Sequence, residues 1–428
     1  MKTLNIKHSG MNGEIEVPGD KSISHRAIIF GSIARGETTI TNFLTSEDCM
    51  RTVNAFRQFG VDIELDENKV TIRSEGIDHF KQPKEPIYLG NSGTTARLIL
   101  GVCATLPFSV QLVGDESLNK RPMKRVIEPL EKMGARFSNQ NSLLPMTVEG
   151  RSLLPIHYDL NVPSAQVKSA IILASLFTKG ETVILEKATT RDHTERMIPL
   201  FNGDIKKSQK SLIVSGKQQL SGATIDIPGD FSSAAFFIVG AIITEGSHIT
   251  IKNVSLNPTR TGLLTVLKRM GAQIETEITS FIGDEPVGTI VAKHSKLTPT
   301  TIDEEEVPLM VDEIPLLALA ATQAKGEMII DHIKELRIKE TDRIKATVNI
   351  LKSLNGNIEE DGDRIKITGT SQLKGSHVES YNDHRMAMMA TIASLIADGP
   401  VSISNYSCIN ISYPNFLNDL NKLVAANE

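Results

Sequence analysis

The chain has 428 residues, of which 40% are hydrophobic and 4% aromatic, and its formal net charge is −5. At about 100 to 200 residues per domain, this length predicts two or three domains with large cores. The acidic balance and the absence of tryptophan argue against nucleic acid or an anionic membrane as a partner, because these attract basic surfaces and nucleobases stack on aromatic side chains.

Three cysteines, Cys49, Cys103 and Cys408, stand far apart without a CxxC pair, so neither a zinc site nor a disulfide framework is indicated. The N-terminal residues lack the apolar core of a signal peptide, and stretches such as residues 234–243 are shorter than the ~20 residues that span a bilayer. These features predict a cytoplasmic protein. No residue pattern calls for a metal ion or another cofactor.

One pattern of roughly 70 residues occurs six times along the chain. Each copy has a small polar or glycine-bearing turn, an apolar run at helical spacing, a glycine or proline break and a β-rich stretch. The six opening turns begin at Val17, Leu89, Val162, Ile227, Val311 and Tyr381. A second helix ending closes each copy, for example at residues 56–60 and 267–271. This length has room for two helices and three or four strands.

The apolar runs predict helices that are almost fully buried. In residues 27–34 and 171–177, apolar and small side chains cover most of the helical surface. Neighbouring stretches such as residues 38–40 and 182–185 are short and β-branched, which is typical of strands. We therefore expect buried helices enclosed by sheets.

The repeat count, not a linker, predicts the domain boundaries. Three copies per lobe place the lobe crossings where the sequence Pro-Gly-Asp occurs twice, at residues 18–20 and 228–230. One lobe then comprises residues 1–19 plus 230–428, and residues 20–229 form an inserted second lobe. The crossovers lie near Lys21 and Asp230.

Basic residues gather at or beside the repeat starts, although the whole chain is acidic. This distribution indicates a small anionic ligand. The residues concerned are Lys21, Arg26, Arg97, Lys120, Arg121, Lys124, Arg125, Lys168, Arg260, Arg343 and Arg385.

The first two repeat starts suit phosphate binding. Residues 19–26 combine a glycine turn with Lys21, Ser22 and Arg26 at a helix start, where backbone N–H groups also favour an anion. An ordinary capped helix with solvated charges explains this segment equally well. In residues 89–97, Gly93 allows a ligand to approach closely and two threonines offer hydroxyl groups.

Other candidates also have a simpler alternative. The run 120–125 can be a basic surface loop, but Arg121 precedes a proline and is placed to grip a carboxylate or phosphate. Ser164 and Gln166 offer a hydroxyl and an amide at a helix start, where a serine alone is a cap.

The acidic candidates divide in the same way. Asp312 lies in an apolar stretch, and is either a helix cap or a base whose pKa is tuned by partial burial. Residues 337–343 alternate in charge and can form a solvated helix face. Residues 383–385 place an acid, a histidine and an arginine at a repeat start, whereas the acidic run 303–306 is typical of a solvated edge.

In this order, the segments resemble the family of 5-enolpyruvylshikimate-3-phosphate synthases, the 3-phosphoshikimate 1-carboxyvinyltransferases, over nearly the full length. Residues 191–195 and 257–260 further resemble the signatures of class II of that family. The main matching motifs are Gly19-Asp20-Lys21-Ser22, Gly90-Asn91-Ser92-Gly93-Thr94, Lys120-Arg121-Pro122-Met123, Ser164-Ala165-Gln166-Val167-Lys168, Lys339-Glu340-Thr341-Asp342-Arg343 and Asp383-His384-Arg385.

The resemblance implies a two-lobed inverse α/β barrel of six βαβαββ repeats, three per lobe, with the active site in the cleft between the lobes. It implies transfer of the enolpyruvyl group of phosphoenolpyruvate to the 5-hydroxyl of shikimate 3-phosphate, with release of phosphate. This is a step of the shikimate pathway to chorismate and the aromatic amino acids. It also implies small-molecule substrates, no cofactor or metal, and no nucleic-acid or membrane partner, and we expect a monomer.

By matching position, the resemblance assigns roles to residues of this sequence. The proton-transfer candidates are Lys21, Asp312 and Glu340. The residues expected to bind shikimate 3-phosphate are Lys21, Ser22, Arg26, Ser164, Gln166, Asp312 and Lys339. The residues expected to hold phosphoenolpyruvate are Lys21, Gly93, Arg121, Gln166, Arg343 and Arg385.

Two positions depart from class I members of the family. Ile411 stands where those members carry a lysine, and Leu98 replaces a proline after the loop arginine. We therefore expect weaker binding of glyphosate, which competes with phosphoenolpyruvate. Gly93, which is alanine in some strongly tolerant enzymes, is retained here.

Two other functions serve as alternatives. A sister enzyme that acts on UDP-N-acetylglucosamine would carry Lys-Asn in place of Lys21 and Ser22, and a cysteine in the loop 117–120. A two-lobed protein that only binds anionic sugars would need neither Asp312 nor Glu340.

Overall fold

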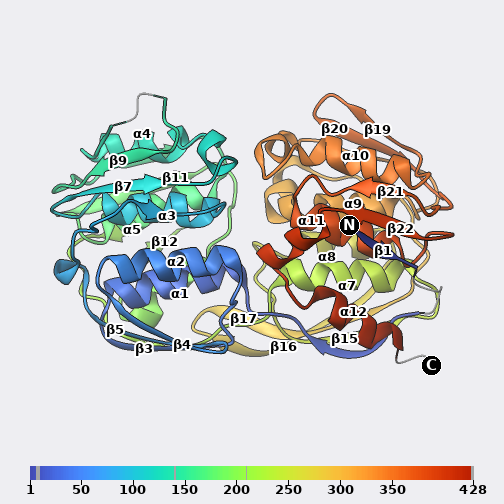
Figure 1. Ribbon diagram of the computed structural model, residues 1–428, viewed down its shortest axis with the longest axis horizontal. Coiled ribbons are helices and arrows are strands. Elements are labelled where there is room, and N and C mark those ends of the chain that lie inside the picture. The colour runs from blue at the N-terminus through green and yellow to red at the C-terminus, as the bar shows by residue number, and fades with distance from the viewer. Residues whose placement is uncertain (6–9, 139–140, 209, 426–428) are drawn as a thin grey trace. The chain divides into compact units, whose positions relative to one another are not determined.

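The computed structural model describes residues 1–5, 10–138, 141–208 and 210–425, and the chain divides into two compact units (Figure 1). The first unit comprises Met1–Pro18, Pro228–Phe281 and Pro286–Glu428. The second comprises Gly19–Ile227 and Ile282–Glu285. Residues 282–285 thus group with the second unit, whereas the lobe boundaries expected from the repeats give them to the lobe that contains both termini.

The second unit contains three four-stranded sheets, in the orders β14-β3-β5-β4, β6-β7-β9-β8 and β10-β11-β13-β12. In each sheet the first pair of strands is parallel and the other two pairs are antiparallel. The strands are β3 (Arg35–Thr41), β4 (Asp62–Asp66), β5 (Lys69–Glu75), β6 (Ile87–Tyr88), β7 (Ser109–Val113), β8 (Arg136–Phe137), β9 (Met146–Glu149), β10 (His157–Leu160), β11 (Glu181–Glu186), β12 (Ile205–Lys207), β13 (Ser211–Ser215) and β14 (Thr224–Asp226).

Three helices of the second unit are largely buried, and each begins at a repeat start. They are α1 (Lys21–Ile33), α3 (Gly93–Cys103) and α5 (Ala165–Ser175). Their N-caps are Asp20, Ser92 and Ser164, whose side chains accept hydrogen bonds from backbone N–H groups of the first turn. The outer helices are α2 (Glu47–Gln58), α4 (Lys124–Lys132) and α6 (His193–Met197), with the short 3₁₀ helices η1 (Ile77–His79), η2 (Leu118–Lys120) and η3 (Ile198–Phe201).

The first unit, as far as its residues are described, has one four-stranded sheet, β16-β17-β15-β2, and two three-stranded sheets, β18-β20-β19 and β1-β22-β21. Its strands are β1 (Lys2–Leu4), β2 (Asn12–Glu16), β15 (His248–Ser255), β16 (Gln273–Ile282), β17 (Glu285–Lys293), β18 (Glu327–Ile330), β19 (Ile358–Asp361), β20 (Arg364–Thr368), β21 (His377–Glu379) and β22 (Val401–Ser404). Its helices are α7 (Phe231–Ile243), α8 (Gly262–Arg269), α9 (Ile314–Ala321), α10 (Arg343–Ser353), α11 (His384–Ala393) and α12 (Phe416–Ala425), with η4 (Glu304–Leu309), η5 (Val311–Glu313), η6 (Lys334–Ile338) and η7 (Tyr406–Ile411).

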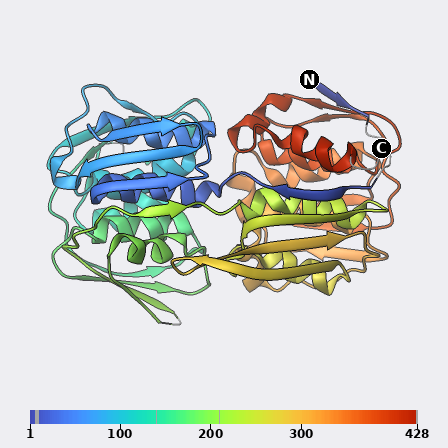
Figure 2. The ribbon, with the colours of Figure 1, turned by 90° about the horizontal axis from the view of Figure 1, so that it is seen from below.

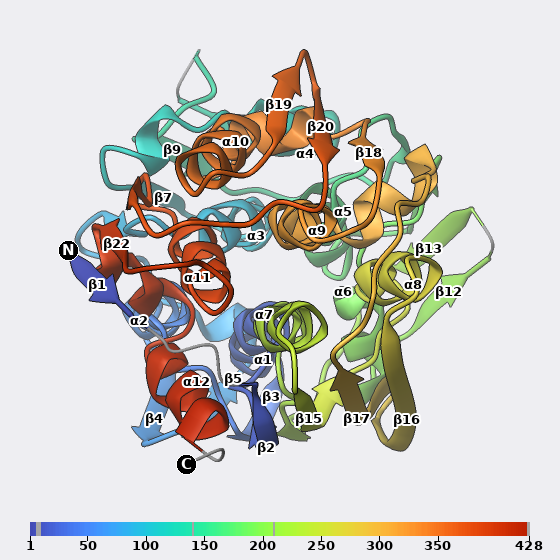
Figure 3. The same cartoon turned by 90° about the vertical axis from the view of Figure 1, so that its right-hand side faces the viewer.

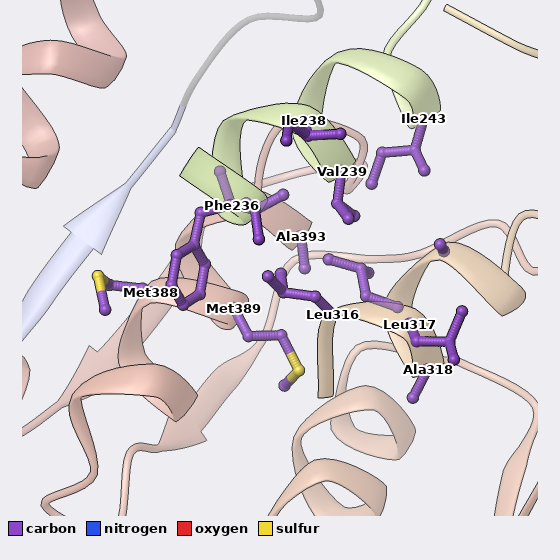
Figure 4. Packing of buried hydrophobic residues seen from close by; sticks show 14 of the residues in the cluster. Phe236, Ile238, Val239, Ile243, Leu316, Leu317, Ala318, Met388, Met389 and Ala393 are labelled. Atoms are coloured by element: carbon purple, nitrogen blue, oxygen red, sulfur yellow. The ribbon is translucent and has the colours of Figure 1, made fainter. Parts of the chain in front are cut away.

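Helices α7, α9 and α11 form the centre of the first unit, and are seen nearly end-on in Figure 3. All eight residues of α9 are buried. Phe236 of α7, Leu316 of α9 and Met389 of α11 belong to one hydrophobic core, in which the three helices meet (Figure 4). These helices carry apolar side chains on all faces because other helices and sheets surround them.

At each point where the chain passes from one unit to the other, the strand before the crossing pairs within its own unit. Strand β2 pairs in parallel with β15 of the first unit before the chain continues into α1 of the second. Strand β14 pairs in parallel with β3 of the second unit before the chain continues into α7 of the first. Figure 2 shows the dark-blue β2 beside the yellow-green β15, at the edge of its sheet.

The recurring Pro-Gly-Asp sequence has a structural reason at both crossings. A Cβ atom at Gly19 would lie 2.0 Å from the carbonyl oxygen of Asn42, and one at Gly229 would lie 2.8 Å from Val17. Only glycine fits where the backbone comes this close. The aspartate that follows is the N-cap of α1 in one case and of α7 in the other.

The sequence predictions of an α/β fold, six repeats and buried helices are confirmed. The orders β6-α3-β7-α4-β8-β9 and β10-α5-β11-α6-β12-β13 reproduce the βαβαββ pattern in full. The strands expected at residues 38–40 and 182–185 lie in β3 and β11. Over the described part of the chain, no helix has the length and apolar character needed to cross a membrane.

Candidate active site

The site residues expected from the sequence lie at or beside helix starts, in one group in each unit. In the second unit, Lys21 and Ser22 open α1, Gly93 opens α3, and Ser164 and Gln166 flank the start of α5. In the first unit, Arg343 opens α10, Arg385 is the second residue of α11, Asp312 lies in η5 just before α9, and Lys339 and Glu340 lie between η6 and α10. Helix starts offer unpaired backbone N–H groups, which favour anions.

Lys21 forms an ion pair with Asp48, with 2.9 Å between Nζ and Oδ2. Asp48 lies in the first turn of α2 and both side chains are largely buried. Sequence reasoning missed Asp48, because its only local signal is the capping serine, Ser46, two residues before it. The pair fixes the ammonium group next to the start of α1.

Arg121 lies beside the start of α3, so the surface-loop interpretation of this arginine is wrong. It is 8% exposed, and it donates hydrogen bonds to the backbone and side-chain oxygens of Asn91. A Cβ atom at Gly93 would lie 3.2 Å from Nη1 of Arg121 and 3.0 Å from Nη1 of Arg97. Glycine at this position therefore leaves room for two guanidinium groups. By contrast, Lys120 and Lys124 are exposed and pair with nearby glutamates.

Gln166 connects α5 to α3. Its Oε1 accepts a hydrogen bond from Nη1 of Arg97 at 2.8 Å, and its Nε2 donates to the hydroxyl of Thr94 at 3.1 Å. These two bonds fix which side of the amide carries the donor. The side chains of Gln166, Arg97 and Thr94 thus link the start of α5 to the first turns of α3.

A buried polar chain lies behind these helix starts. The ring Nδ1 of His25 lies 2.7 Å from the hydroxyl of Thr52, which lies 2.8 Å from that of Thr95, which lies 2.7 Å from that of Ser92. Burial lowers the pKa of His25 well below its usual value, and the positive charges of Lys21 and Arg26 lower it further. His25 is therefore neutral at pH 7.

Two cations that were expected to indicate an anionic ligand have structural partners instead. Lys168 lies 2.6 Å from Glu195 and 2.9 Å from Glu186, with its side chain 1% exposed. Burial acts to lower the pKa of Lys168, but the two carboxylates outweigh it and raise the pKa. Arg260 is buried beside Asp230 and donates to the hydroxyl of Ser232. A cation at a repeat start is thus not by itself a sign of an anion site.

Arg343 is the centre of the group in the first unit. It lies 2.7 Å from Asp383, 2.5 Å from Glu340 and 3.1 Å from Asp312. Burial acts to lower the pKa of the Arg343 guanidinium, but these carboxylates outweigh it and raise the pKa. With its side chain 2% exposed, Arg343 does not belong to a solvated helix face.

Asp312 contacts three cations, so its interpretation as a helix cap is wrong. Its carboxylate lies 3.3 Å from Lys339, 3.1 Å from Arg343 and 3.9 Å from Arg385. The residue that precedes α9 directly is Glu313, which lies 3.4 Å from Arg385. Asp312 is 11% exposed at its side chain, and the base interpretation remains a proposal.

Two further carboxylates, Asp383 and Glu313, support the site, although the sequence did not indicate them as site residues. Asp383 is fully buried, accepts a hydrogen bond from the backbone N–H of Arg385, and binds Arg343.

The acidic run 303–306 forms a capped 3₁₀ helix, in which Glu306 pairs with Arg269. Within the described residues, no three His, Cys, Asp or Glu side chains are grouped so that they could hold a metal ion.

The fold and these two groups define the class of protein. The chain has the fold of enolpyruvyl transferases, since its structure is similar to that of NikO from Streptomyces tendae, with a TM-score of 0.77 at 14% identity over 98% of this chain and 97% of that one. It is also similar to EPSP synthase from Acinetobacter baumannii, with a TM-score of 0.88 at 40% identity over 98% of each chain.

Sequence comparison gives the family. The sequence model of EPSP synthase (3-phosphoshikimate 1-carboxyvinyltransferase) matches residues 6–420. The relative from Oceanobacillus iheyensis, named 3-phosphoshikimate 1-carboxyvinyltransferase, is 47% identical over 97% of each chain, and that from Bacillus subtilis is 46% identical over 96% of this chain and 97% of its own. The chain therefore belongs to the EPSP synthase family. The prediction of an enzyme of this family is confirmed, and it is favoured over the UDP-N-acetylglucosamine alternative.

Proposed function

We propose that the chain transfers the enolpyruvyl group of phosphoenolpyruvate to the 5-hydroxyl of shikimate 3-phosphate, and that the groups at the helix starts of both units take part in this one reaction. The observation that carries the proposal is the match to the EPSP synthase family over residues 6–420, with the residues assigned by the resemblance located at helix starts. Both substrates carry phosphate and carboxylate groups, which suit these positions.

In the second unit, the proposal assigns anion binding to the basic and polar side chains. Lys21, Ser22, Arg26, Ser164 and Gln166 bind shikimate 3-phosphate. Its phosphate and carboxylate accept hydrogen bonds from the cationic donors, and its ring hydroxyls bond to the serine and amide groups. Phosphoenolpyruvate is held by Lys21, Gly93, Arg121 and Gln166, and Gly93 lets the substrate approach the backbone N–H groups at the start of α3.

In the first unit, Asp312 and Lys339 bind shikimate 3-phosphate, and Arg343 and Arg385 hold phosphoenolpyruvate. Arg343 is already bound by three carboxylates, and these fix its guanidinium in one orientation. Such a fixed cation stabilises the charge on the departing phosphate without having to reorganise during the reaction.

The reaction needs two proton movements. The 5-hydroxyl oxygen attacks C2 of phosphoenolpyruvate and loses its proton, while the methylene carbon gains one, which gives a tetrahedral intermediate. Loss of phosphate and of a proton from the new methyl group then completes the transfer. The groups that move these protons are drawn from Lys21, Asp312 and Glu340. No cofactor takes part in these steps.

The remaining expectations are part of the same proposal. We propose a cytoplasmic monomer that acts on two small molecules, with neither nucleic acid nor a membrane as a partner. Glyphosate competes with phosphoenolpyruvate and binds weakly, because Ile411 stands where class I members provide a lysine.

The direct test measures inorganic phosphate released from phosphoenolpyruvate by purified protein, without added metal or nucleotide. Release is expected with shikimate 3-phosphate as acceptor and not with UDP-N-acetylglucosamine. Release with the nucleotide sugar only, or with neither acceptor, would show that the proposed function is wrong.

A matched pair of variants tests the anion-binding assignment. Arg121→Gln removes a charged donor and is expected to raise the KM for phosphoenolpyruvate by about 10- to 100-fold, from the ~1.5–3 kcal/mol that a hydrogen bond to a charged group contributes. Lys124→Gln in the same basic run is the control, because its side chain is 70% exposed. Equal KM values for both variants would contradict the role of Arg121.

A further inference from the structure

The segment 190–197 carries one of the class II signatures but has no part in the proposed reaction. It contains Asp192, followed by the short helix α6 (His193–Met197). Residues 192–195 are all buried, although three of the four are aspartate, histidine and glutamate. A row of buried polar residues is costly unless each has a partner or a purpose.

One residue of this segment contacts a proposed ligand of shikimate 3-phosphate. The hydroxyl of Thr194 accepts a hydrogen bond from Nε of Arg26 at 2.6 Å. Nη2 of Arg26 donates to the hydroxyl of Ser169 at 2.8 Å, and Nη1 donates to the backbone oxygen of Ser22 at 2.9 Å. The two hydroxyls lie 2.6 Å from each other. Each of the three nitrogens of the guanidinium group is therefore held from a different direction.

The chemistry of these three bonds suits an arginine that has to bind an anion. All three acceptors are neutral oxygens, so these bonds fix the orientation of Arg26 without cancelling its positive charge. Lys168 in the same unit is different, because it is paired with the carboxylates of Glu186 and Glu195.

The residues on both sides of Thr194 along the chain lie next to carboxylates or cations of other elements. The next residue, Glu195, lies 2.6 Å from Lys168 of α5. The preceding residue, His193, lies 3.4 Å from Glu285, a carboxylate of the segment Ile282–Glu285 that belongs to the second unit. A hydroxyl held between two such anchors keeps its place when a ligand binds, which is what a supporting residue requires.

We propose that Thr194 is a positioning residue that orients the guanidinium of Arg26 for shikimate 3-phosphate. This inference rests on the proposed function, in which Arg26 binds that substrate. It gives the signature segment a specific role: Thr194 makes the contact, and its neighbours His193 and Glu195 hold it in place. Thr194 acts through Arg26 and does not touch the substrate.

The test measures the dissociation constant for shikimate 3-phosphate by calorimetry, together with kcat and the KM for phosphoenolpyruvate. Thr194→Val keeps the shape of the side chain but removes the hydroxyl, and is expected to raise that dissociation constant about tenfold, while kcat at saturation and the KM for phosphoenolpyruvate change less than about twofold. Thr194→Ser restores the hydroxyl and is expected to restore the affinity.

Thr182→Val is the matched control, because Thr182 is fully buried in the same unit and its hydroxyl has no hydrogen-bond partner. It should leave the affinity unchanged. If Thr194→Val does not fold, Ser169→Ala removes the second hydroxyl bound to Arg26, and the same rise is expected.

Separate outcomes address the two proposals. If Arg26→Gln weakens binding of shikimate 3-phosphate and Thr194→Val does not, the positioning role is overturned while the proposed function stands. If wild-type protein neither binds shikimate 3-phosphate nor releases phosphate, the proposed function itself fails. A lower melting temperature of Thr194→Val with unchanged affinity shows a purely structural residue and also overturns the inference.

Discussion

The two groups of charged residues at the helix starts differ in how their cations are held. In the second unit, Arg26, Arg97 and Arg121 donate to hydroxyl, amide and carbonyl oxygens, and Lys21 is the exception because it pairs with the carboxylate of Asp48. In the first unit, Lys339, Arg343 and Arg385 contact the carboxylates of Asp312, Glu313, Glu340 and Asp383. One sequence signal, a cation at a repeat start, therefore leads to two different electrostatic environments.

The different partners of the cations suit two different tasks, anion binding and proton transfer. A hydrogen bond to a neutral oxygen orients a cation without neutralising it, which suits the binding of phosphate and carboxylate groups. Cations held by carboxylates form a fixed network in which an acid or base can operate beside a positive charge. We infer that the second unit contributes more to anion binding and the first unit more to proton transfer. The predictions below test this division, beginning with the largest expected effect.

The largest effect is expected from the carboxylates of the first unit. Asp312→Asn and Glu340→Gln preserve size but prevent proton exchange, so each is expected to lower kcat by about 10²- to 10⁴-fold while affinity for shikimate 3-phosphate largely survives. Steady-state phosphate release measures this change. Glu359→Gln, at a carboxylate that is 63% exposed, is the control. Near-normal turnover in either site variant would mean that its carboxylate is not a proton carrier.

The second prediction compares the two groups by stability. Asp383→Asn preserves the cap of α11 but removes a fully buried charge next to Arg343, and is expected to lower the free energy of unfolding by about 3 kcal/mol. Asp48→Asn removes a carboxylate partner of Lys21, where the two side chains are 12% and 17% exposed and not fully buried, and is expected to cost about 1 kcal/mol. Urea unfolding of the two variants and wild type provides the values. Equal losses would contradict the difference between the groups.

Local sequence patterns were sufficient for the repeats and the helix starts. Gly93 at the start of α3, the cap Ser164 and the apolar helices follow from short-range rules, and the structure places them as expected. The partners of the cations could not be predicted in this way. Lys168 looks like a ligand of an anion in the sequence, but Glu186 and Glu195 reach it only through folding of β11 and α6.

The partners of the carboxylate of Asp312 could not be predicted from the local sequence either. A helix cap is a local property, and the sequence around Asp312 is compatible with one. The three cations around its carboxylate lie on η6, α10 and α11 or just beside them, between 27 and 73 residues further along the chain, as the separation from Lys339 (339 − 312) and Arg385 (385 − 312) shows. Only the packing of these elements distinguishes a cap from a charged site.

The third and smallest prediction concerns the pKa of His25, which lies buried in the second unit near Lys21 and Arg26. Folding lowers the pKa of His25 below the value of 6.5 that it has in the unfolded chain, first through burial and then through Lys21 and Arg26. Below pH 6.5 the unfolded chain therefore takes up a proton that the folded chain does not, so the free energy of unfolding falls as the pH falls. The contribution of His25 is fully present above pH 6.5, and about 1 kcal/mol of it is expected to be lost between pH 7 and pH 5.5.

The measurement is urea unfolding of wild type and His25→Asn across this pH range. Asparagine retains a partner for Thr52 but does not titrate, so the loss of stability in acid is expected to be about 1 kcal/mol smaller in the variant. His79→Asn changes a histidine that is 56% exposed and should leave the pH dependence as in wild type. Parallel curves for wild type and His25→Asn would show that His25 takes up its proton equally well in the folded chain. Neither burial nor the positive charges of Lys21 and Arg26 would then lower the pKa of His25.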